Sequence, residues 1–389
     1  MQYATRATVH LDALRANIVA IKSLIGDRHL LMPVKANAYG HGAVAVSQFL
    51  EREGLADWLG VSTVPEALEL REAGVGLPIL KLSLSFRDEL DALLANDIAL
   101  TVADEPAADD AEAAAAARNT VARVHLKIDT GMRRIGCEEA AAAGLATYIS
   151  ACHHLDLQGI STHLPISDEA DDDGFTETEL AGFTDVVAHI QADRAAAGLA
   201  PVPLVHASNS GGILAHSLDG LTMVRPGIAL YGCYPDATTP RPVELRPVMS
   251  LTSKVAAVKR IAAGQTVGYG RTWTAPRDTW IATVPVGYAD GFSRLNSNRG
   301  AMLVNGRRCP VAGRVCMDTT MLDLGPCEDA GPGSSPEPPV QVGDLVTWLG
   351  TDGAETITAD DLAAIMGTIS YEVFCLIGAR VPRDYADAG

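Results

Sequence analysis

A lysine that directly follows an apolar run is the first residue whose position suggests chemistry. Residues 30–34 are mostly apolar, and Lys35 comes next, at the start of a segment that also contains Tyr39 and two glycines. Low dielectric around such a lysine favours its neutral amine, which is the form that makes a Schiff base with a carbonyl cofactor. The alternative is a lysine whose ammonium group simply extends from a strand end into solvent.

A second group of residues is suited to binding a phosphate. The segment 223–232 contains Gly227 and Ile228, whose backbone N–H groups could donate to phosphate oxygens, and Ser210 could add its hydroxyl. The late loops of eight-fold barrels commonly hold a phosphate with such groups. The alternative for Ser210 is the role of a helix N-cap, which does not exclude phosphate binding.

The elements that must position these residues follow one rhythm along the first 230 residues. Short apolar runs alternate with Ala-rich amphipathic stretches such as 64–73, 87–94 and 175–197. This alternation indicates a parallel sheet, and eight units of this size predict a (β/α)8 barrel with functional residues at the C-terminal ends of its strands. The predicted strands are 30–34, 59–62, 79–82, 98–102, 121–128, 157–162, 204–206 and 222–224.

The sequence changes character after Tyr231. Residues 235–247 are rich in Pro, Thr and Arg and are typical of a linker, and the segments that follow are mostly β-like. We therefore predict a barrel domain in residues 1–235 and a mostly β domain in residues 236–389. Its expected elements are strands at 250–261, 280–285, 301–304 and 315–322, a helix at 359–365 and a proline-rich surface loop at 326–339.

Composition restricts the class of protein. The net charge of −18 argues against general binding to nucleic acid or to an anionic membrane surface. The seven cysteines are odd in number and form no C-x-x-C pair, so neither a structural zinc site nor a disulfide framework is expected, and no other metal site is predicted. No apolar run is long enough to span a membrane, and no secretory signal is expected at the N-terminus, so a cytoplasmic protein is the expectation.

The chain resembles bacterial alanine racemases in six motifs that keep their order and approximate spacing. The resemblance runs from about residue 6 to residue 383. It implies an amino-acid racemase that depends on pyridoxal phosphate and makes D-alanine for peptidoglycan. The motifs lie at 34–42, 127–136, 223–232, 266–272, 285–291 and 313–318.

The resemblance implies a two-base reaction. Lys35 would carry the cofactor as a Schiff base and transfer a proton on one face of the substrate Cα, and Tyr269 would do so on the opposite face, from the partner subunit of a homodimer. Racemisation needs proton transfer on both faces, so two separate groups make chemical sense. Arg225 would bond the pyridine nitrogen and, because arginine keeps its proton, leave that nitrogen unprotonated. Simple reprotonation would then be favoured over transamination.

The resemblance also implies roles for residues around the cofactor and the substrate. Arg134 would hold the cofactor's phenolic oxygen and the substrate carboxylate. His163 would support Arg225, and Lys127 matches a position that is carbamylated in some relatives; a lysine paired with an acid is its alternative. The phosphate would be surrounded by Tyr39, Ser210, Gly227, Ile228 and Tyr371. The substrate site would be lined by Met317 and Tyr288, both from the partner subunit.

Two of these residues have a simpler interpretation, and two features depart from the family pattern. Met317 could be ordinary core packing, and Tyr371 could be a core tyrosine of the β-rich tail. The segment 164–166 reads Leu-Pro-Ile where relatives have aromatic and small residues, and Arg133 adds a charge beside Arg134. Both departures bear on substrate choice.

Three competing functions remain at this point. The first is a serine or broad-specificity racemase of the same family, whose serine-directed members tend to lack a tyrosine at the position of Tyr371. The second is a decarboxylase for basic amino acids, which normally has an acidic residue where Arg225 stands. The third is a non-catalytic pyridoxal-phosphate carrier, which would resemble the barrel alone and lack Tyr269 and Met317.

Overall fold

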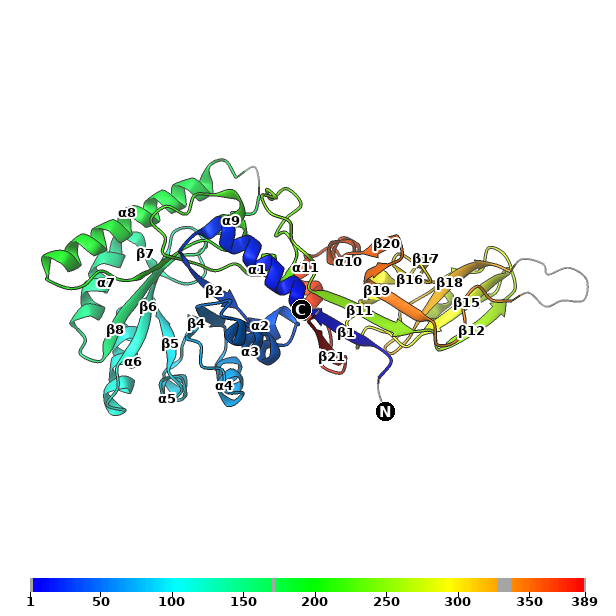
Figure 1. The fold of residues 1–389 in the computed structure, drawn as a ribbon, viewed down its shortest axis with the longest axis horizontal. Helices are drawn as coiled ribbons and strands as arrows, with labels where there is room; N and C mark the ends of the chain where they lie inside the picture. Colours follow the sequence, from blue (N-terminus) through cyan, green and yellow to red (C-terminus); the bar gives the residue numbers. More distant parts are fainter. Residues whose placement is uncertain (1–2, 170–171, 328–336, 388–389) are drawn as a thin grey trace, which may run out of the picture. The chain divides into compact units, whose positions relative to one another are not determined.

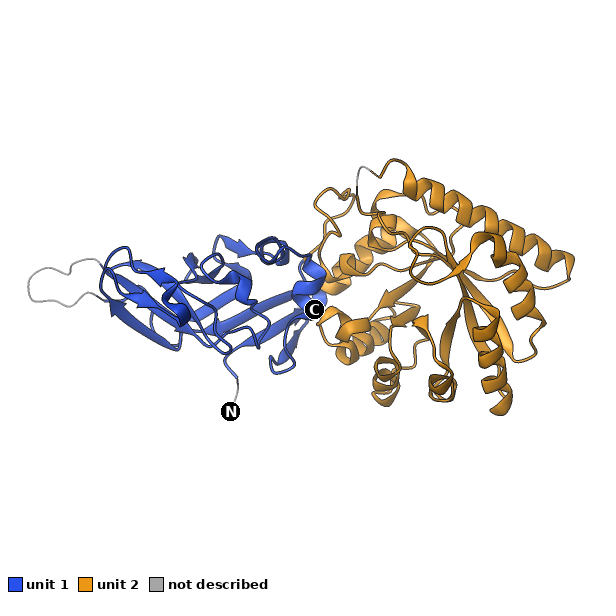
Figure 2. Cartoon of the chain, turned by 180° about the vertical axis from the view of Figure 1, so that it is seen from behind, with its two compact units in different colours: residues 1–13, 247–389 blue, residues 14–246 orange. Residues whose placement is uncertain are grey.

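The computed structural model describes residues 3–169, 172–327 and 337–387. The chain divides into two compact units (Figure 2). One consists of residues 14–246 (orange), and the other, called the second unit in the text, consists of residues 1–13 and 247–389 (blue, labelled unit 1 in the figure). The division at 246/247 falls inside the predicted linker, eleven residues after the predicted boundary at 235/236. The first thirteen residues belong to the second unit because strand β1 (Arg6–His10) pairs with strands of that unit.

The unit of residues 14–246 is a nearly closed barrel of eight parallel strands (Figure 1). The last gap is bridged by backbone hydrogen bonds from Thr222 to Val205 (3.0 Å) and from Arg225 to Ser208 (2.9 Å). A short strand, β7 (Cys137–Glu138), pairs beside β6. Around the barrel the strands follow the order β10 (Met223–Val224), β2 (His29–Pro33), β3 (Trp58–Val61), β4 (Ile79–Leu84), β5 (Ile98–Val102), β6 (Ala122–Asp129), β8 (Leu155–Ser161) and β9 (Leu204–His206).

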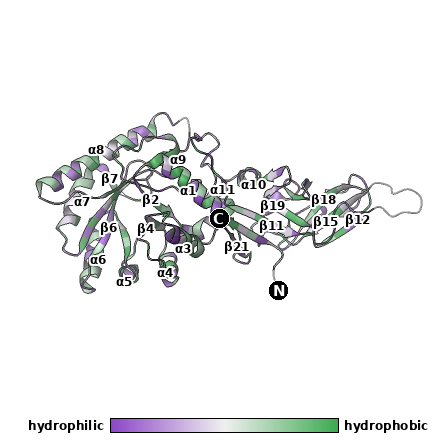
Figure 3. Ribbon diagram, viewed as in Figure 1, coloured by the Kyte–Doolittle hydropathy of each residue, from purple (hydrophilic) through white to green (hydrophobic). Residues whose placement is uncertain are grey.

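Helices surround these strands on the outside, and Figure 3 shows that long ones such as α8 carry both hydrophilic and hydrophobic residues. Thr63 caps α4 with a capping box, and Asp104 caps α6, so local sequence sets where both helices begin. The helices are α1 (Leu11–Ile25), α2 (Lys35–Tyr39), α3 (Ala43–Glu53), α4 (Val64–Glu72), η1 (Arg87–Glu89), α5 (Leu90–Ala95), α6 (Glu105–Ala117), α7 (Glu139–Ala151), α8 (Phe175–Ala196), α9 (Ser210–Ala215) and η2 (Ile228–Tyr231).

The barrel strands form because they are apolar on both faces. All five residues of β5 are buried, as are all four of β3, which is the pattern of a strand covered on both sides. Six strands contribute to one packed layer, and side chains fill the barrel as in other barrels of this class. The layer consists of Leu31, Trp58, Leu80, Ala99, Leu204 and Met223.

The second unit is mostly β, and its described residues also form two α-helices and two short 3-10 helices. Its largest sheet has the order β17-β16-β19-β11-β1-β21, with β20 paired to β19; β12, β15 and β18 form a second sheet, and β13 and β14 a third. The bounds are β11 (Met249–Lys254), β12 (Ala257–Ile261), β13 (Thr266–Val267), η3 (Tyr269–Arg271), β14 (Trp273–Thr274), β15 (Thr279–Val284), η4 (Arg294–Asn296), β16 (Ala301–Val304), β17 (Arg307–Pro310), β18 (Thr320–Pro326), β19 (Leu345–Asp352), β20 (Glu355–Ile357), α10 (Ala359–Met366), α11 (Ser370–Cys375) and β21 (Arg383–Ala386).

The predicted fold class, a (β/α)8 barrel followed by a mostly β domain, is confirmed, but two predicted strands of the second unit were wrong in detail. The strand at 250–261 is two strands, because β11 pairs with β19 whereas β12 pairs with β15. The strand at 315–322 begins only at Thr320, because Cys316 N–H closes a turn on Thr319 O (2.9 Å) and Val315 N–H bonds to Ser297 Oγ (3.0 Å). Most of the predicted loop 326–339 lies outside the described residues.

Candidate active site

Lys35 emerges from the C-terminal end of β2 into a strained turn. The four residues after it, Ala36 to Tyr39, have φ angles between 51° and 55°. This left-handed conformation costs about 1–2 kcal/mol for each residue that has a Cβ. The turn is held by hydrogen bonds from Ala38 N to Val34 O (2.7 Å) and from Ala36 N to Glu66 Oε1 (2.7 Å). Strain that the surrounding structure maintains in this way is concentrated at functional sites.

The predicted phosphate-binding residues of the barrel gather beside this turn. Ser210 Oγ accepts hydrogen bonds from Gly227 N (2.9 Å) and from Ala229 N (3.2 Å). Tyr39 stacks on Tyr231 with ring centroids 5.0 Å apart, and a Cβ placed on Gly227 would lie 2.8 Å from the Tyr39 hydroxyl. The absence of a side chain at residue 227 therefore keeps this hydroxyl next to the backbone that precedes η2.

Helix α9 also settles the alternative role of Ser210. The N-cap is Asn209, whose Oδ1 accepts a hydrogen bond from Gly212 N (3.0 Å). Ser210 is the first helical residue, and its hydroxyl is directed toward the Gly227 backbone instead. The capping interpretation of Ser210 was therefore wrong.

Arg225 follows β10 and is almost completely buried. Its Nη1 lies 2.7 Å from His206 Nδ1, and its Nη2 donates to Thr162 O (2.7 Å) and Ala207 O (2.8 Å). Its Nε–H has no acceptor within residues 3–169, 172–327 and 337–387. Burial and then the charge of Arg134 lower the pKa of Arg225 to about 10, so the guanidinium remains charged at neutral pH.

Two buried histidines continue this hydrogen-bond chain away from Arg225. His206 Nε2 lies 2.8 Å from His125 Nδ1. Because the guanidinium can only donate, His206 Nδ1 must accept, so we assign the His206 proton to Nε2 and, by the same step, the His125 proton to its Nε2. Burial, followed by nearby arginines, lowers the pKa of His125 to about 3 and lowers that of His206 as well. Both imidazoles are therefore neutral and orient Arg225 without competing for its charge.

Lys127, near the end of β6, and Glu179, on α8, are both buried and influence each other electrostatically. Burial, then Arg225, lowers the pKa of Lys127 well below its ordinary value, with a further lowering from Arg134, so its neutral amine is favoured. Glu179 comes from α8; its Oε1 accepts a hydrogen bond from Thr130 Oγ1 (3.2 Å), and its Oε2 is buried without a partner among the described residues. Burial raises the pKa of Glu179 to about 7.

Arg134 is exposed, and Arg133 is exposed beside it with φ 55°. The positive charge of Arg133, which departs from the family pattern, is paired with an acidic side chain, because its Nη1 lies 3.0 Å from Glu138 Oε2. Asp129 Oδ1 shapes this loop by accepting hydrogen bonds from Gly131 N (3.0 Å) and Arg133 N (2.9 Å). Arg133 is thus bound to an acid on the surface and adds little positive charge to the site.

His163 lies next to Arg225, as the resemblance implied, with 3.4 Å between its Nδ1 and Arg225 Nη2. Burial and then Arg225 lower its pKa to about 2. In the Leu-Pro-Ile segment that follows, Leu164 is buried, and its carbonyl accepts a hydrogen bond from Asn209 (3.2 Å). This segment therefore packs against the loop that begins α9.

Within the described ranges, no group of three or more His, Cys, Asp or Glu side chains could hold a metal.

The remaining predicted residues belong to the second unit. Tyr269 is 71% exposed in η3, and Met317 is 53% exposed, so the alternative of Met317 as core packing was wrong. Tyr288 lies beside Met317 in the fold, because Ala289 N donates to Met317 O (3.1 Å) and Tyr288 N to Cys316 O (3.0 Å).

Tyr371 is half-buried on α11, on a helix instead of the β-rich tail that was expected.

Family models decide what this combination of barrel and β unit is. The alanine racemase N-terminal domain matches residues 9–235, and the alanine racemase C-terminal domain matches residues 248–385. This chain belongs to the alanine racemase family. It is therefore an enzyme of the isomerase class, in a family that depends on pyridoxal phosphate.

Individual relatives agree over nearly their whole length. The alanine racemase of Cutibacterium acnes is 45% identical over 97% of both chains, and that of Treponema denticola is 42% identical over 99% of this chain and 98% of its own. Among solved structures, the alanine racemase of Clostridium difficile 630 has a TM-score of 0.89 at 35% identity and covers 100% of this chain and 97% of its own. A Bacillus anthracis alanine racemase with bound L-Ala-P has a TM-score of 0.88 at 34% identity, with 100% and 96% covered.

Three buried residues of this alanine racemase family member were missed in the sequence. His125 and His206 lie in β6 and β9, and Glu179 lies on α8. For the two histidines the available signal was a polar residue in an apolar strand, in the middle of β6 for His125 and at the end of β9 for His206. Glu179 gave no signal, since a glutamate on an amphipathic helix is ordinary.

In the described part of the chain, no helix is long and apolar enough to cross a membrane.

Proposed function

We propose that this enzyme interconverts L-alanine and D-alanine, with pyridoxal phosphate attached to Lys35 and with Lys35 and Tyr269 as the two proton-transfer groups. The observation that carries the proposal is the position of Lys35, which follows a buried strand and precedes four strained residues. The last of these, Tyr39, lies against Gly227, whose amide bonds to Ser210. The named activity of relatives up to 45% identical supports alanine as the substrate.

The side chains of the barrel fit this cofactor. Ser210, Gly227, Ile228 and Tyr39 would hold the phosphate, and the amide of Ile228, as the first residue of η2, has no partner within its own helix. The free Nε–H of Arg225 would donate to the pyridine nitrogen. When bound, the cofactor withdraws electrons from the amino acid and makes the Cα proton easier to remove.

The residues of the chain then divide the proton transfers between them. Lys35 Nζ holds or delivers a proton on one face of Cα, and Tyr269 Oη does so on the other face, which inversion at carbon requires. Arg225 stays charged because its pKa of about 10 lies well above neutral pH, so it offers a hydrogen bond and no transferable proton. His163, His206 and His125 hold Arg225 in place.

Other residues bind and shape the substrate. Arg134 would hold the substrate carboxylate, and Tyr288 and Met317 would limit the space for its side chain, while Tyr371 would add to the phosphate site. Lys127 is a candidate for carbamylation, because its pKa is lowered and the neutral amine is the form that reacts with carbon dioxide.

We further propose that the enzyme is a homodimer that acts in the cytoplasm and supplies D-alanine for peptidoglycan. Tyr269, Tyr288 and Met317 are all strongly exposed in the single chain, as expected for residues that complete the site of a partner subunit.

The experiment is a chiral product assay with purified enzyme and pyridoxal phosphate, with L-alanine and L-serine as separate substrates. We expect D-alanine to form faster than D-serine. Lys35→Ala should reduce the rate by orders of magnitude, because the variant loses both the anchor and one proton-transfer group. Lys259→Ala, at an exposed lysine of β12, is the matched control and should keep full activity. A preference for serine, or an active Lys35→Ala enzyme, would contradict the proposal.

A further inference from the structure

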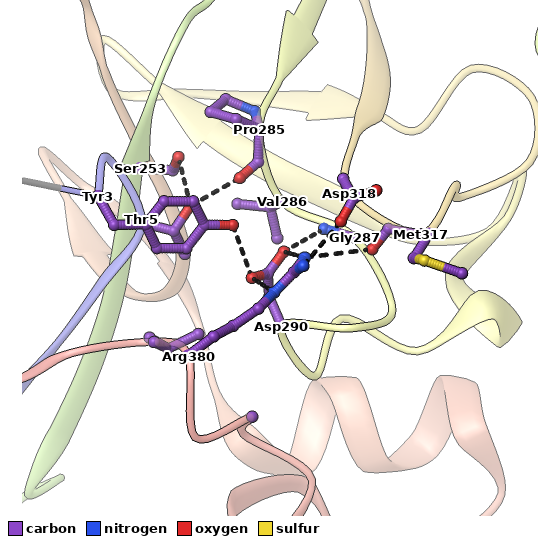
Figure 4. Close-up of polar contacts among 12 residues, drawn as sticks. Tyr3, Thr5, Ser253, Pro285, Val286, Gly287, Asp290, Met317, Asp318 and Arg380 are labelled. Atoms are coloured by element: carbon purple, nitrogen blue, oxygen red, sulfur yellow. Dashed lines mark hydrogen bonds and ion pairs between the residues drawn. The ribbon is translucent and has the colours of Figure 1, made fainter.

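Three segments of the second unit meet at Asp290, and Tyr3 of the N-terminal segment joins them, as Figure 4 shows. The segment that carries Tyr288 is joined to the segment that carries Met317 by the hydrogen bonds of Tyr288 N and Ala289 N described above. The segment that follows α11 joins them through Gly378 N, which donates to Asp290 O (3.1 Å). The three predicted site residues Tyr288, Met317 and Tyr371 therefore lie on segments with one common junction.

The carboxylate of Asp290 is completely buried and accepts four hydrogen bonds. Its Oδ2 accepts from Gly287 N (2.8 Å) and Arg380 Nη2 (3.0 Å), and its Oδ1 accepts from Arg380 Nε (2.8 Å) and Tyr3 Oη (2.8 Å). The paired bonds from Arg380 form the planar fork that fixes a guanidinium on a carboxylate.

Arg380 extends the junction to the Met317 segment. Its Nη1 donates to Asp318 Oδ1 (2.7 Å), and its Nη2 lies 3.5 Å from Met317 O. Hydrogen bonds to the carboxylates of Asp290 and Asp318 raise the pKa of Arg380 above its ordinary value. One guanidinium thus ties the Tyr288 segment to the Met317 segment.

The two segments approach each other as closely as their backbones permit. A Cβ placed on Gly287 would lie 2.2 Å from Met317 O, so only glycine fits there. By contrast, the side chains of Tyr288 and Met317 are 42% and 53% exposed. Packing around these two side chains is sparse in the single chain, so their separation depends on how the backbones beneath them are held.

We propose that Asp290, through Arg380, is a positioning residue that sets the separation of Tyr288 and Met317 and so determines which amino-acid side chain the enzyme accepts. The inference rests on the proposed function, in which these two residues line the substrate site. It goes beyond that function because it assigns the substrate preference to an ion-pair cluster around one buried carboxylate, which does not touch the substrate.

The test compares Arg380→Met with Arg380→Lys and with the control Arg308→Met, which removes an exposed ion pair to Glu355 in the same unit. Two quantities are measured for each variant. The first is hydrogen–deuterium exchange of the amides of residues 287–289, which needs no activity. The second is the ratio of kcat/KM for L-serine or L-2-aminobutyrate to kcat/KM for L-alanine.

Arg380→Met should speed amide exchange at residues 287–289 by tenfold or more and raise the ratio for the larger substrates by about tenfold, mainly through KM. Arg380→Lys keeps the charge and should show smaller changes in both quantities than Arg380→Met. Arg308→Met should change neither quantity. Tyr3→Phe, which removes one of the four bonds to Asp290, should shift both quantities in the same direction by a smaller amount, and it serves if Arg380→Met does not fold.

Unchanged exchange in Arg380→Met and Tyr3→Phe would overturn the inference, and so would an equal fall of kcat/KM for all substrates, which a merely structural role would give. Failure of the proposed function would look different, because the unaltered enzyme would then form no D-alanine while the exchange result would still report on the cluster.

Discussion

At the scale of single residues, the site depends on which buried groups carry charge. Arg225 remains charged although it is buried, because it donates to two backbone carbonyls and to a neutral histidine. The histidines can be neutral because burial and nearby arginines lower their pKa values. A cation that keeps its proton is what the proposed reaction needs beside the pyridine nitrogen.

Arg225→Glu tests that role. A carboxylate at this position would favour a protonated pyridine nitrogen and thus greater electron withdrawal, so racemisation should fall by roughly tenfold or more while transamination, measured as pyruvate released from alanine, should rise. Arg225→Lys keeps the charge and should lose rate without gaining pyruvate. If Arg225→Glu folds and shows no more pyruvate than the unaltered enzyme, the account of Arg225 is wrong.

Glu179 gives a prediction for stability against pH. Its pKa is raised from an ordinary value of 4.5 to about 7, so the folded state binds its proton more tightly than the unfolded state does. The stabilisation is complete below pH 4.5 and is lost as pH rises through about 7. Glu179→Gln stays neutral at every pH. Its free energy of unfolding, relative to that of the unaltered protein, should therefore rise by on the order of 2 kcal/mol as the pH goes from 5 to 8.

Chemical denaturation of both proteins at several pH values measures this difference. Glu72→Gln, at an exposed glutamate of α4, is the control and should show no such trend with pH. A stability difference between Glu179→Gln and the unaltered protein that stays constant from pH 5 to pH 8 would contradict the raised pKa.

At the scale of elements, the barrel could be predicted because its strands are short, continuous apolar runs. The predicted strands 98–102 and 204–206 have the observed bounds, and the other six differ at their ends by three residues or fewer. The segment 315–319 was mistaken for strand because its apolar residues resemble one, while its turn depends on a hydrogen bond from Val315 to the distant Ser297. Pairing between segments far apart in sequence leaves no such local pattern.

The left-handed turn after Lys35 could not be predicted either, because Ala36, Asn37, Ala38 and Tyr39 all carry a Cβ. Only the surrounding contacts, such as the bond from Ala36 N to Glu66, maintain it. The site residues themselves were predictable as motifs, whereas the buried support of His125, His206 and Glu179 was not. Such support arises from tertiary packing, which the motifs do not encode.

Ala36→Gly tests whether this turn stores strain. Glycine adopts positive φ at no steric cost, so relief of about 1–2 kcal/mol should exceed the added chain entropy of roughly 0.5–1 kcal/mol. The variant should be equally or slightly more stable, by up to about 1 kcal/mol, yet less active because Lys35 is held less firmly. Ala113→Gly, at an exposed position in the middle of α6, is the matched control and should lose about 1 kcal/mol. Equal losses of stability at both positions would show that the turn is not strained.

At the scale of the whole molecule, the two units have separate tasks in the proposed function. The barrel contains Lys35, Arg225 and the phosphate-binding groups, and the β unit contains Tyr269, Tyr288 and Met317. A homodimer with twofold symmetry would complete two equivalent sites from both chains.

Subunit mixing tests this assembly. Lys35→Ala and Tyr269→Ala should each be inactive alone. After exchange, one site of the mixed dimer would carry both defects and the other would carry none. Activity should recover to about a quarter of the unaltered enzyme, because about half of the dimers are mixed and each has one intact site. No recovery after proven subunit exchange would mean that both residues serve a site within one chain.

The central claim is that Lys35 carries the cofactor, and borohydride reduction followed by peptide mapping tests it most directly. The purified enzyme, loaded with pyridoxal phosphate, is reduced, digested and analysed by mass spectrometry. We predict one cofactor per chain, fixed on the peptide that contains Lys35 and lost in Lys35→Ala. Lys127 is the informative competitor, because it is buried and its pKa is lowered well below the ordinary value of a lysine. Cofactor fixed on Lys127 or on another lysine in the unaltered enzyme would contradict the account.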